Sequence, residues 1–97
     1  MKYRFKWDSR KNALNLRKHG VSFEDAAVVF SDPQRLEIND KMHSLLEERW
    51  MTVGLNMTAV LKVIFTERNG FIRIISARKA SKKEQEDYFY GYRNIRN

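Results

Sequence analysis

The stretch Phe71-Ile72-Arg73-Ile74-Ile75-Ser76-Ala77-Arg78-Lys79-Ala80 is an apolar, β-branched run that ends in two adjacent cations. This composition favours a strand, and its apolar content on both faces favours a central one. Period-two alternation places Ile72, Ile74, Ser76 and Arg78 on one face, and Phe71, Arg73, Ile75, Ala77 and Lys79 on the other. Because arginine is seldom buried without a partner, these cations are expected either to form structural ion pairs or to line an anion site.

The composition is that of a folded basic domain. The 97 residues include 19 lysines and arginines against 12 acidic residues, which gives a formal net charge of +7, and 42% are hydrophobic. This length predicts a single domain spanning residues 1–97. Excess positive charge on a folded domain most often binds nucleic acid or an acidic partner protein, so we expect one of these ligands. The alternative is that the charge only keeps the domain soluble.

Cysteine is absent, and the histidines are His19 and His43, so disulfides, thiolate zinc sites and a histidine-rich metal site are not expected. We expect no metal and no cofactor. The apolar runs are shorter than the roughly 20 residues that cross a bilayer, and the N-terminus alternates cations with aromatic residues instead of forming a signal-peptide core. These features predict a cytoplasmic protein without a membrane partner.

Two helices are expected in the N-terminal part. The first has Asp8 as N-cap, runs to Lys18 and stops at Gly20. The apolar side chains available for burial on it are Ala13, Leu14 and Leu16. The second begins at Ser22 and ends at Asp32-Pro33, because proline cannot continue a helix.

The rest of the pattern predicts an α+β fold with an antiparallel sheet and a C-terminal helix. The expected strands are residues 3–7 at an edge, 35–39, 48–53, 59–66 and the stretch from Phe71, with a mobile loop that holds His43 at 40–46. Asn69-Gly70 is a type I′ hairpin signal, and the last three strands should form a meander. Ser81 and Glu84 form a capping box that opens the last helix. The rings on this helix expected to pack on the sheet are Tyr88, Phe89 and Tyr92, and stacking of nucleic-acid bases on them is the alternative.

Several sequence blocks follow one another along nearly the whole chain: Phe5-x-Trp7-Asp8, Asn15-x-x-Lys18-His19-Gly20-Val21-x-Phe23, Asp32-Pro33, Glu48-Arg49-Trp50, the stretch from Arg73 to Ala80, and finally Glu84 and Tyr88. Together they resemble the BrnT family of type II toxins. The resemblance implies a compact RelE-like ribonuclease fold and an inhibitory BrnA-type antitoxin with a ribbon-helix-helix DNA-binding part. It also implies that operator DNA is bound only through the toxin-antitoxin complex. The tail after Gly91 matches no pattern of the family.

RNA can be cut without a metal, because its 2′-hydroxyl can attack the adjacent phosphate when an enzyme supplies a base, an acid and charge stabilisation. Arg78 and Lys79, with Arg49 from the third strand, are expected to stabilise the phosphate. His19 and Glu48 are the candidates for proton transfer; the alternatives are a histidine that only ends its helix and a glutamate in a salt bridge. Further residues expected to contact RNA are Arg73, Ser76, Lys82 and Lys83.

Glu48 and Arg49 would point to opposite faces of a regular strand, so both line one cleft only at a bulge or a strand end. Three classes of function therefore stay open. They are a toxin endoribonuclease that inhibits translation and growth, a non-catalytic nucleic-acid-binding module, and a protein-interaction module for an acidic partner. The family resemblance and the cation-bearing strand favour the toxin.

Overall fold

The computed structural model describes residues 3–41 and 47–96, with residues 92–96 described by their backbone alone. The loop expected at 40–46, with His43, therefore lies almost entirely outside the described residues. The elements in chain order are β1 (Arg4–Lys6), α1 (Ser9–His19), α2 (Phe23–Ala27), the 3-10 helix η1 (Val28–Ser31), β2 (Leu36–Asn39), β3 (Trp50–Leu55), β4 (Val60–Arg68), β5 (Phe71–Lys79) and α3 (Lys82–Arg96). No helix among the described residues is long and apolar enough to cross a membrane.

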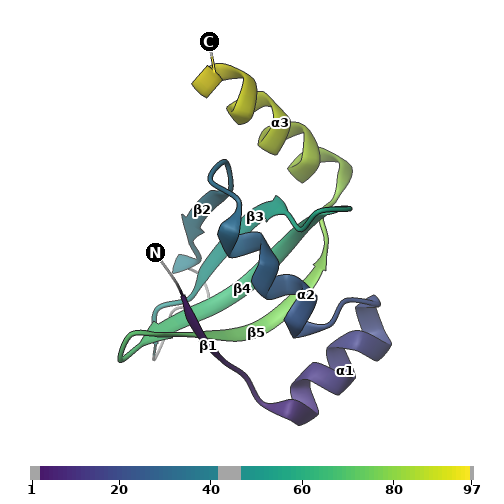
Figure 1. Ribbon diagram of the computed structural model, residues 1–97, viewed down its shortest axis with the longest axis vertical. Coiled ribbons are helices and arrows are strands. Elements are labelled where there is room, and N and C mark those ends of the chain that lie inside the picture. The colour runs from purple at the N-terminus through teal and green to yellow at the C-terminus, as the bar shows by residue number, and fades with distance from the viewer. Residues whose placement is uncertain (1–2, 42–46, 97) are drawn as a thin grey trace.

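The five strands form one sheet in the order β1-β5-β4-β3-β2 (Figure 1). Strands β3, β4 and β5 form the expected antiparallel meander, and β2 pairs antiparallel with β3. The sheet is nevertheless mixed, because the short edge strand β1 runs parallel to β5. Asn69 and Gly70 have φ of 53° and 80°, as a type I′ hairpin requires. The α+β class, the two N-terminal helices and the C-terminal helix are confirmed.

Helix α1 has the predicted ends but not the predicted buried face. The Asp8 carboxylate accepts hydrogen bonds from the backbone N–H groups of Arg10 and Lys11, and Gly20 ends the helix in the left-handed region at φ 71°. The residues expected to be buried, Ala13, Leu14 and Leu16, are instead exposed. The buried residue of α1 is Asn15, because the helix lies against the backbone edge of β5.

Helix α1 lies against the backbone edge of β5, and one face of the sheet is covered by α2 and η1 (Figure 1). The main core lies between these helices and the sheet; its buried residues are Val21, Phe23, Ala26, Val29, Phe30, Leu61, Val63, Phe65, Ile72, Ile74 and Ala77. Helix α2 begins at the predicted N-cap, where Ser22 accepts from the Asp25 N–H at 3.0 Å. Its last turn tightens into η1 before Pro33. The second helix is thus confirmed, in two parts.

Strand β3 begins two residues later than expected and also ends two residues later, at Leu55, so that it includes Gly54. A Cβ atom on Gly54 would lie 2.8 Å from Val29 Cγ1 and 2.9 Å from Arg35 Cβ. The glycine therefore serves the close approach of η1 to the sheet. As a result of the shift, Glu48 and Arg49 precede the strand.

A β-bulge in β5 changes the assignment of its faces. Ile64 pairs with Ser76 but its neighbour Phe65 pairs with Ile74, so Ile75 is the extra residue. Ile72, Ile74 and Ala77 are consequently buried together in the main core. The alternation expected beyond Ile75 is therefore wrong, and Arg73 and Arg78 share the face opposite the core.

Helix α3 covers only one end of the sheet face opposite the main core, and it extends beyond the sheet (Figure 1). A smaller core there contains Val53, Val60, Ala80 and Tyr88, with Leu36 packed against it. The Tyr88 hydroxyl donates to Asp32 Oδ2 at 2.5 Å. Of the rings expected to pack on the sheet, Tyr88 is buried, Phe89 is exposed, and the Tyr92 side chain lies outside the described residues.

Candidate nucleic-acid interface

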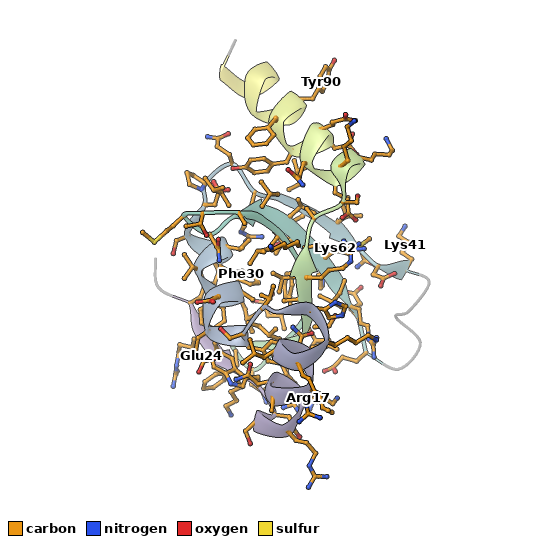
Figure 2. All side chains as sticks on the ribbon, turned by 90° about the vertical axis from the view of Figure 1, so that its right-hand side faces the viewer. Arg17, Glu24, Phe30, Lys41, Lys62 and Tyr90 are labelled. Atoms are coloured by element: carbon orange, nitrogen blue, oxygen red, sulfur yellow. The ribbon has the colours of Figure 1, made fainter. Side chains whose placement is uncertain are left out.

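The sheet face opposite α2 and η1 carries a row of cations, and we call it the open face. In Figure 2, Phe30 and Glu24 lie on one side of the sheet, and Lys62 lies on the other. Strand pairing places on the open face Arg4, Lys6, Met51, Lys62, Ile64, Arg68, Phe71, Arg73, Ser76 and Arg78. Helix α3 covers the end of this face near Val53 and Val60, and Thr66 on the same face is buried, whereas Arg4, Lys6, Arg68 and Arg73 at the hairpin end are exposed.

Arg78 is held at one end of the open face by Glu84. Its Nη1 and Nη2 donate to the two carboxylate oxygens of Glu84 at 2.9 and 3.0 Å, and Nη1 also donates to the Lys79 carbonyl at 2.9 Å. Lys62, which pairs with Arg78 across the strands, lies 3.5 Å from the same carboxylate. The capping box brings Glu84 there, since the Ser81 N–H donates to Glu84 at 2.8 Å and the Ser81 hydroxyl accepts from the Glu84 N–H at 3.1 Å.

Glu84 is a permanent anion at neutral pH. Burial acts to raise its pKa, but the hydrogen bonds from Arg78 and Ser81, together with the charges of Arg78 and Lys62, lower the pKa to about 2. A carboxylate with so low a pKa is a poor base and a good anchor. The Glu84 carboxylate occupies the Nη1–Nη2 edge of the Arg78 guanidinium. The N–H groups on the Nε–Nη2 edge have no partner among the described residues, so this edge can take a phosphate.

The other residues predicted for this end of the sheet are Ser76, Lys79, Lys82 and Lys83. Ser76 is half-buried on the open face, opposite Ile64. Lys79 is exposed at the end of β5, where it pairs with Leu61 of the main core and so lies on the face opposite Arg78. Lys82 and Lys83 are exposed in the first turn of α3. Lys83 lies 3.7 Å from Asp87, one turn later. Lys82 and Lys83 add positive charge to the start of α3, the helix that carries Glu84.

Arg73 stands at the opposite end of β5 and is exposed. The sequence favours the anion site for Arg78 and makes Arg73 the candidate for a structural ion pair, whereas the structure places the ion pair on Arg78. Arg73 is the strand neighbour of Lys6, with no ion pair among the described residues. Arg49 lies at the same end of the sheet, directly before β3.

His19 and Glu48 are not brought together. His19 ends α1, one turn after Asn15, which is bonded to the backbone of Ala77 near the end of β5. Glu48 precedes Trp50, which lies in one row with Phe65 and Ile74. Ala77 lies three residues beyond that row in β5, whereas Glu48 lies two residues before it, just ahead of β3. Because β3 and β5 run in the same direction, the two positions are at opposite ends of the sheet. The two candidates for proton transfer therefore belong to different ends of the sheet.

Lys62 and Glu84 belong to this site although the sequence pattern does not assign them to it. Lys62 is the single cation within the apolar run Val60-Leu61-Lys62-Val63-Ile64-Phe65, and the same signal singles out Arg73 in β5. Glu84 is predicted from sequence only as a capping residue. Its second role depends on where α3 starts relative to β5, which periodicity does not reveal.

The structure thus defines a basic α+β protein whose open sheet face offers a row of cations to an anionic ligand. Among the described residues, no three histidine, aspartate or glutamate side chains gather into a group that could hold a metal ion. The family model of BrnT, the ribonuclease toxin of a type II toxin-antitoxin system, matches residues 7–84. The chain therefore belongs to the BrnT toxin family, and its partner is an antitoxin. Among curated proteins no match was found.

Proposed function

We propose that this toxin is an endoribonuclease that cleaves RNA in the cytoplasm without a metal ion and thereby inhibits translation and growth. The observation that carries the proposal is the open face. Its cations extend from Arg73 to Arg78, whereas the ion-paired carboxylates beside them belong to Glu47 and Glu84. Such a surface attracts the phosphates of an RNA strand by charge alone.

In the proposed reaction, Arg78 holds the phosphate that is attacked. The Nε–Nη2 edge binds its non-bridging oxygens, while Glu84 fixes the guanidinium from the other edge. The 2′-oxygen loses its proton to a base and bonds to phosphorus. The bond from phosphorus to the 5′-oxygen breaks, and an acid protonates the leaving oxygen. The products are a 2′,3′-cyclic phosphate and a free 5′-hydroxyl, with Lys62, the strand neighbour of Arg78 on the open face, stabilising the transition-state charge.

His19 is our choice for proton transfer at this phosphate. It ends α1 beside the end of β5 that carries Arg78 and Lys79. Glu48 and Arg49 lie at the other end of the sheet, so we assign them to contacts with RNA farther along the strand. Because a proton donor or acceptor must come within hydrogen-bond reach of the reacting oxygens, His19 and Glu48 cannot both serve one phosphodiester from those positions.

The first prediction is that purified toxin cleaves RNA equally well with and without excess EDTA. Arginine and lysine supply the charge stabilisation that a divalent ion would otherwise give. Cleavage is followed on gels, and the new ends are analysed chemically. Arg78→Ala protein prepared in parallel serves as the control for contaminating nucleases. Loss of cleavage in EDTA with recovery on adding Mg²⁺, or products with 5′-phosphates, would contradict the mechanism.

We further propose that a BrnA-like ribbon-helix-helix antitoxin neutralises the toxin by covering the open face. An inhibitor that places carboxylates over these cations associates fast and excludes phosphate. Operator DNA is then bound only by the complex, through the antitoxin. The antitoxin is expected to displace a non-cleavable RNA from the toxin, as measured by fluorescence anisotropy, and Arg78→Glu should weaken the binding of both. A stable complex of toxin, antitoxin and RNA would rule out this form of inhibition.

A further inference from the structure

The hairpin end of the open face contains a hollow of about 280 Å³. We call it the hairpin pocket, and its lining residues are Lys6, Arg68, Asn69, Phe71 and Arg73. They come from β1, from the end of β4, from the β4–β5 hairpin and from the start of β5. Three of the five are cations, so the pocket selects an anion.

The parallel edge strand gathers these charges. It pairs Arg4 with Phe71 and Lys6 with Arg73. The Lys6 ammonium lies 4.0 Å from the centre of the Phe71 ring, and the Arg4 guanidinium lies 4.4 Å from it. The negative face of an aromatic ring attracts cations, which offsets part of the repulsion between like charges held close together. The pocket is therefore built before any ligand arrives.

One carboxylate contacts a lining residue of the pocket. Glu47 accepts a hydrogen bond from Arg68 Nε at 2.8 Å. Lys6 and Arg73, by contrast, have no ion pair among the described residues. Even with Arg68 neutralised by Glu47, the pocket keeps a net positive charge from Lys6 and Arg73, and the amide of Asn69 adds a polar group on its wall.

We propose that the hairpin pocket is a second phosphate-binding subsite for RNA, separate from the phosphate held by Arg78. This rests on the proposed function and adds a site to it. Arg73 and Arg78 pair with Thr66 and Lys62, four residues apart on β4. At about 3.3 Å per residue the two sites lie about 13 Å apart, which a stacked strand covers in about four nucleotides.

The substrate class follows from the position of the pocket. Both subsites lie on one sheet face, and the strip between them contains Ser76 and Ile64 without a described carboxylate. A single RNA strand can thus occupy both ends. The bound RNA must then extend about four nucleotides from the scissile phosphate, so very short oligomers lose the contribution of the hairpin pocket. Lys6, Arg68 and Arg73 are binding residues, and they take no part in bond breaking.

The test compares Lys6→Gln/Arg73→Gln with the matched control Lys11→Gln/Arg17→Gln, which removes two exposed cations from α1. The probes are a trimer and an octamer of fully 2′-O-methylated RNA, which cannot be cleaved. Affinities are measured by fluorescence anisotropy over a series of salt concentrations. For the octamer, the pocket variant should bind about tenfold more weakly than the control, with a salt slope shallower by about 1.4, the value for two lost phosphate contacts to a single strand. Trimer affinity should be equal for both variants.

Several outcomes would overturn the proposal. Equal octamer affinities and salt slopes for the two variants would remove the subsite, while the proposed function would stand if wild-type protein still cuts RNA. Wild-type protein that neither binds nor cuts RNA would refute both. A pocket variant that keeps its RNA affinity but loses antitoxin would show a protein-binding surface instead. Tighter binding of a DNA octamer than of the RNA octamer by wild-type protein would also refute an RNA subsite. So would a pocket variant that loses binding of inorganic phosphate but keeps its affinity for the RNA octamer.

Discussion

Arg78→Ala is expected to lower the rate of RNA cleavage by a factor of about 10² to 10³, the usual cost of losing one preorganised donor at a developing charge. Growth inhibition should be lost with it. The reason is geometric, since Glu84 holds one edge of the guanidinium and leaves the other for phosphate. Cleavage rates at saturating RNA and growth curves after induction are the measurements.

Two further variants separate charge from geometry. Arg78→Lys keeps the positive charge but loses the paired donors, so its rate should lie between those of wild type and Arg78→Ala. Arg17→Ala removes an exposed cation from α1 and should change neither cleavage nor growth. Because the Arg78 side chain is 37% exposed, losing its ion pair should cost about 1 kcal/mol or less. A folded Arg78→Ala protein that cuts RNA at the wild-type rate would disprove the assignment.

The sheet faces on which Arg73 and Arg78 lie could not be predicted from the sequence. Alternation places Arg73 and Arg78 on opposite faces, whereas the bulge at Ile75 puts them on one face. A bulge shifts the alternation by one residue, but the doublet Ile74-Ile75 that marks it here is equally expected of a central strand buried on both faces. The ion pair of Arg78 was also not predictable, because it needs the distance between β5 and α3.

Features decided by a few neighbouring residues were predicted correctly. The Asp8 N-cap, the Gly20 stop and the Ser81–Glu84 capping box each satisfy backbone groups within one helical turn. The Asn69-Gly70 hairpin likewise follows from backbone preference alone. Features that depend on tertiary approach were missed, such as Gly54 within β3 and the exposed leucines of α1. The candidate site is of the second kind, because its cations come from three strands.

Asn15→Ala is expected to destabilise the fold far more than Arg78→Ala does. The Asn15 side chain donates to the carbonyls of Val21 at 2.9 Å and Ala77 at 2.8 Å, and accepts from the Ala77 N–H at 3.2 Å. Strand β1 pairs only with Phe71–Arg73, so farther along β5 this amide replaces a neighbouring strand. Alanine would leave these three backbone groups without the partner that now satisfies them.

At about 1 kcal/mol or more for each lost buried hydrogen bond, Asn15→Ala should lower the free energy of unfolding by at least about 3 kcal/mol and the Tm by about 12–24 °C. Asn15→Asp tests the bonding pattern at nearly constant shape. Its carboxylate can still accept from Ala77 but faces two carbonyls, so it should be no more stable than the alanine variant. Asn12→Ala, which loses a half-buried bond to the Phe23 N–H, should cost about 1 kcal/mol. Thermal melts in which Asn15→Ala matches Asn12→Ala would show that Asn15 does not hold α1, and with it His19, against the edge of β5.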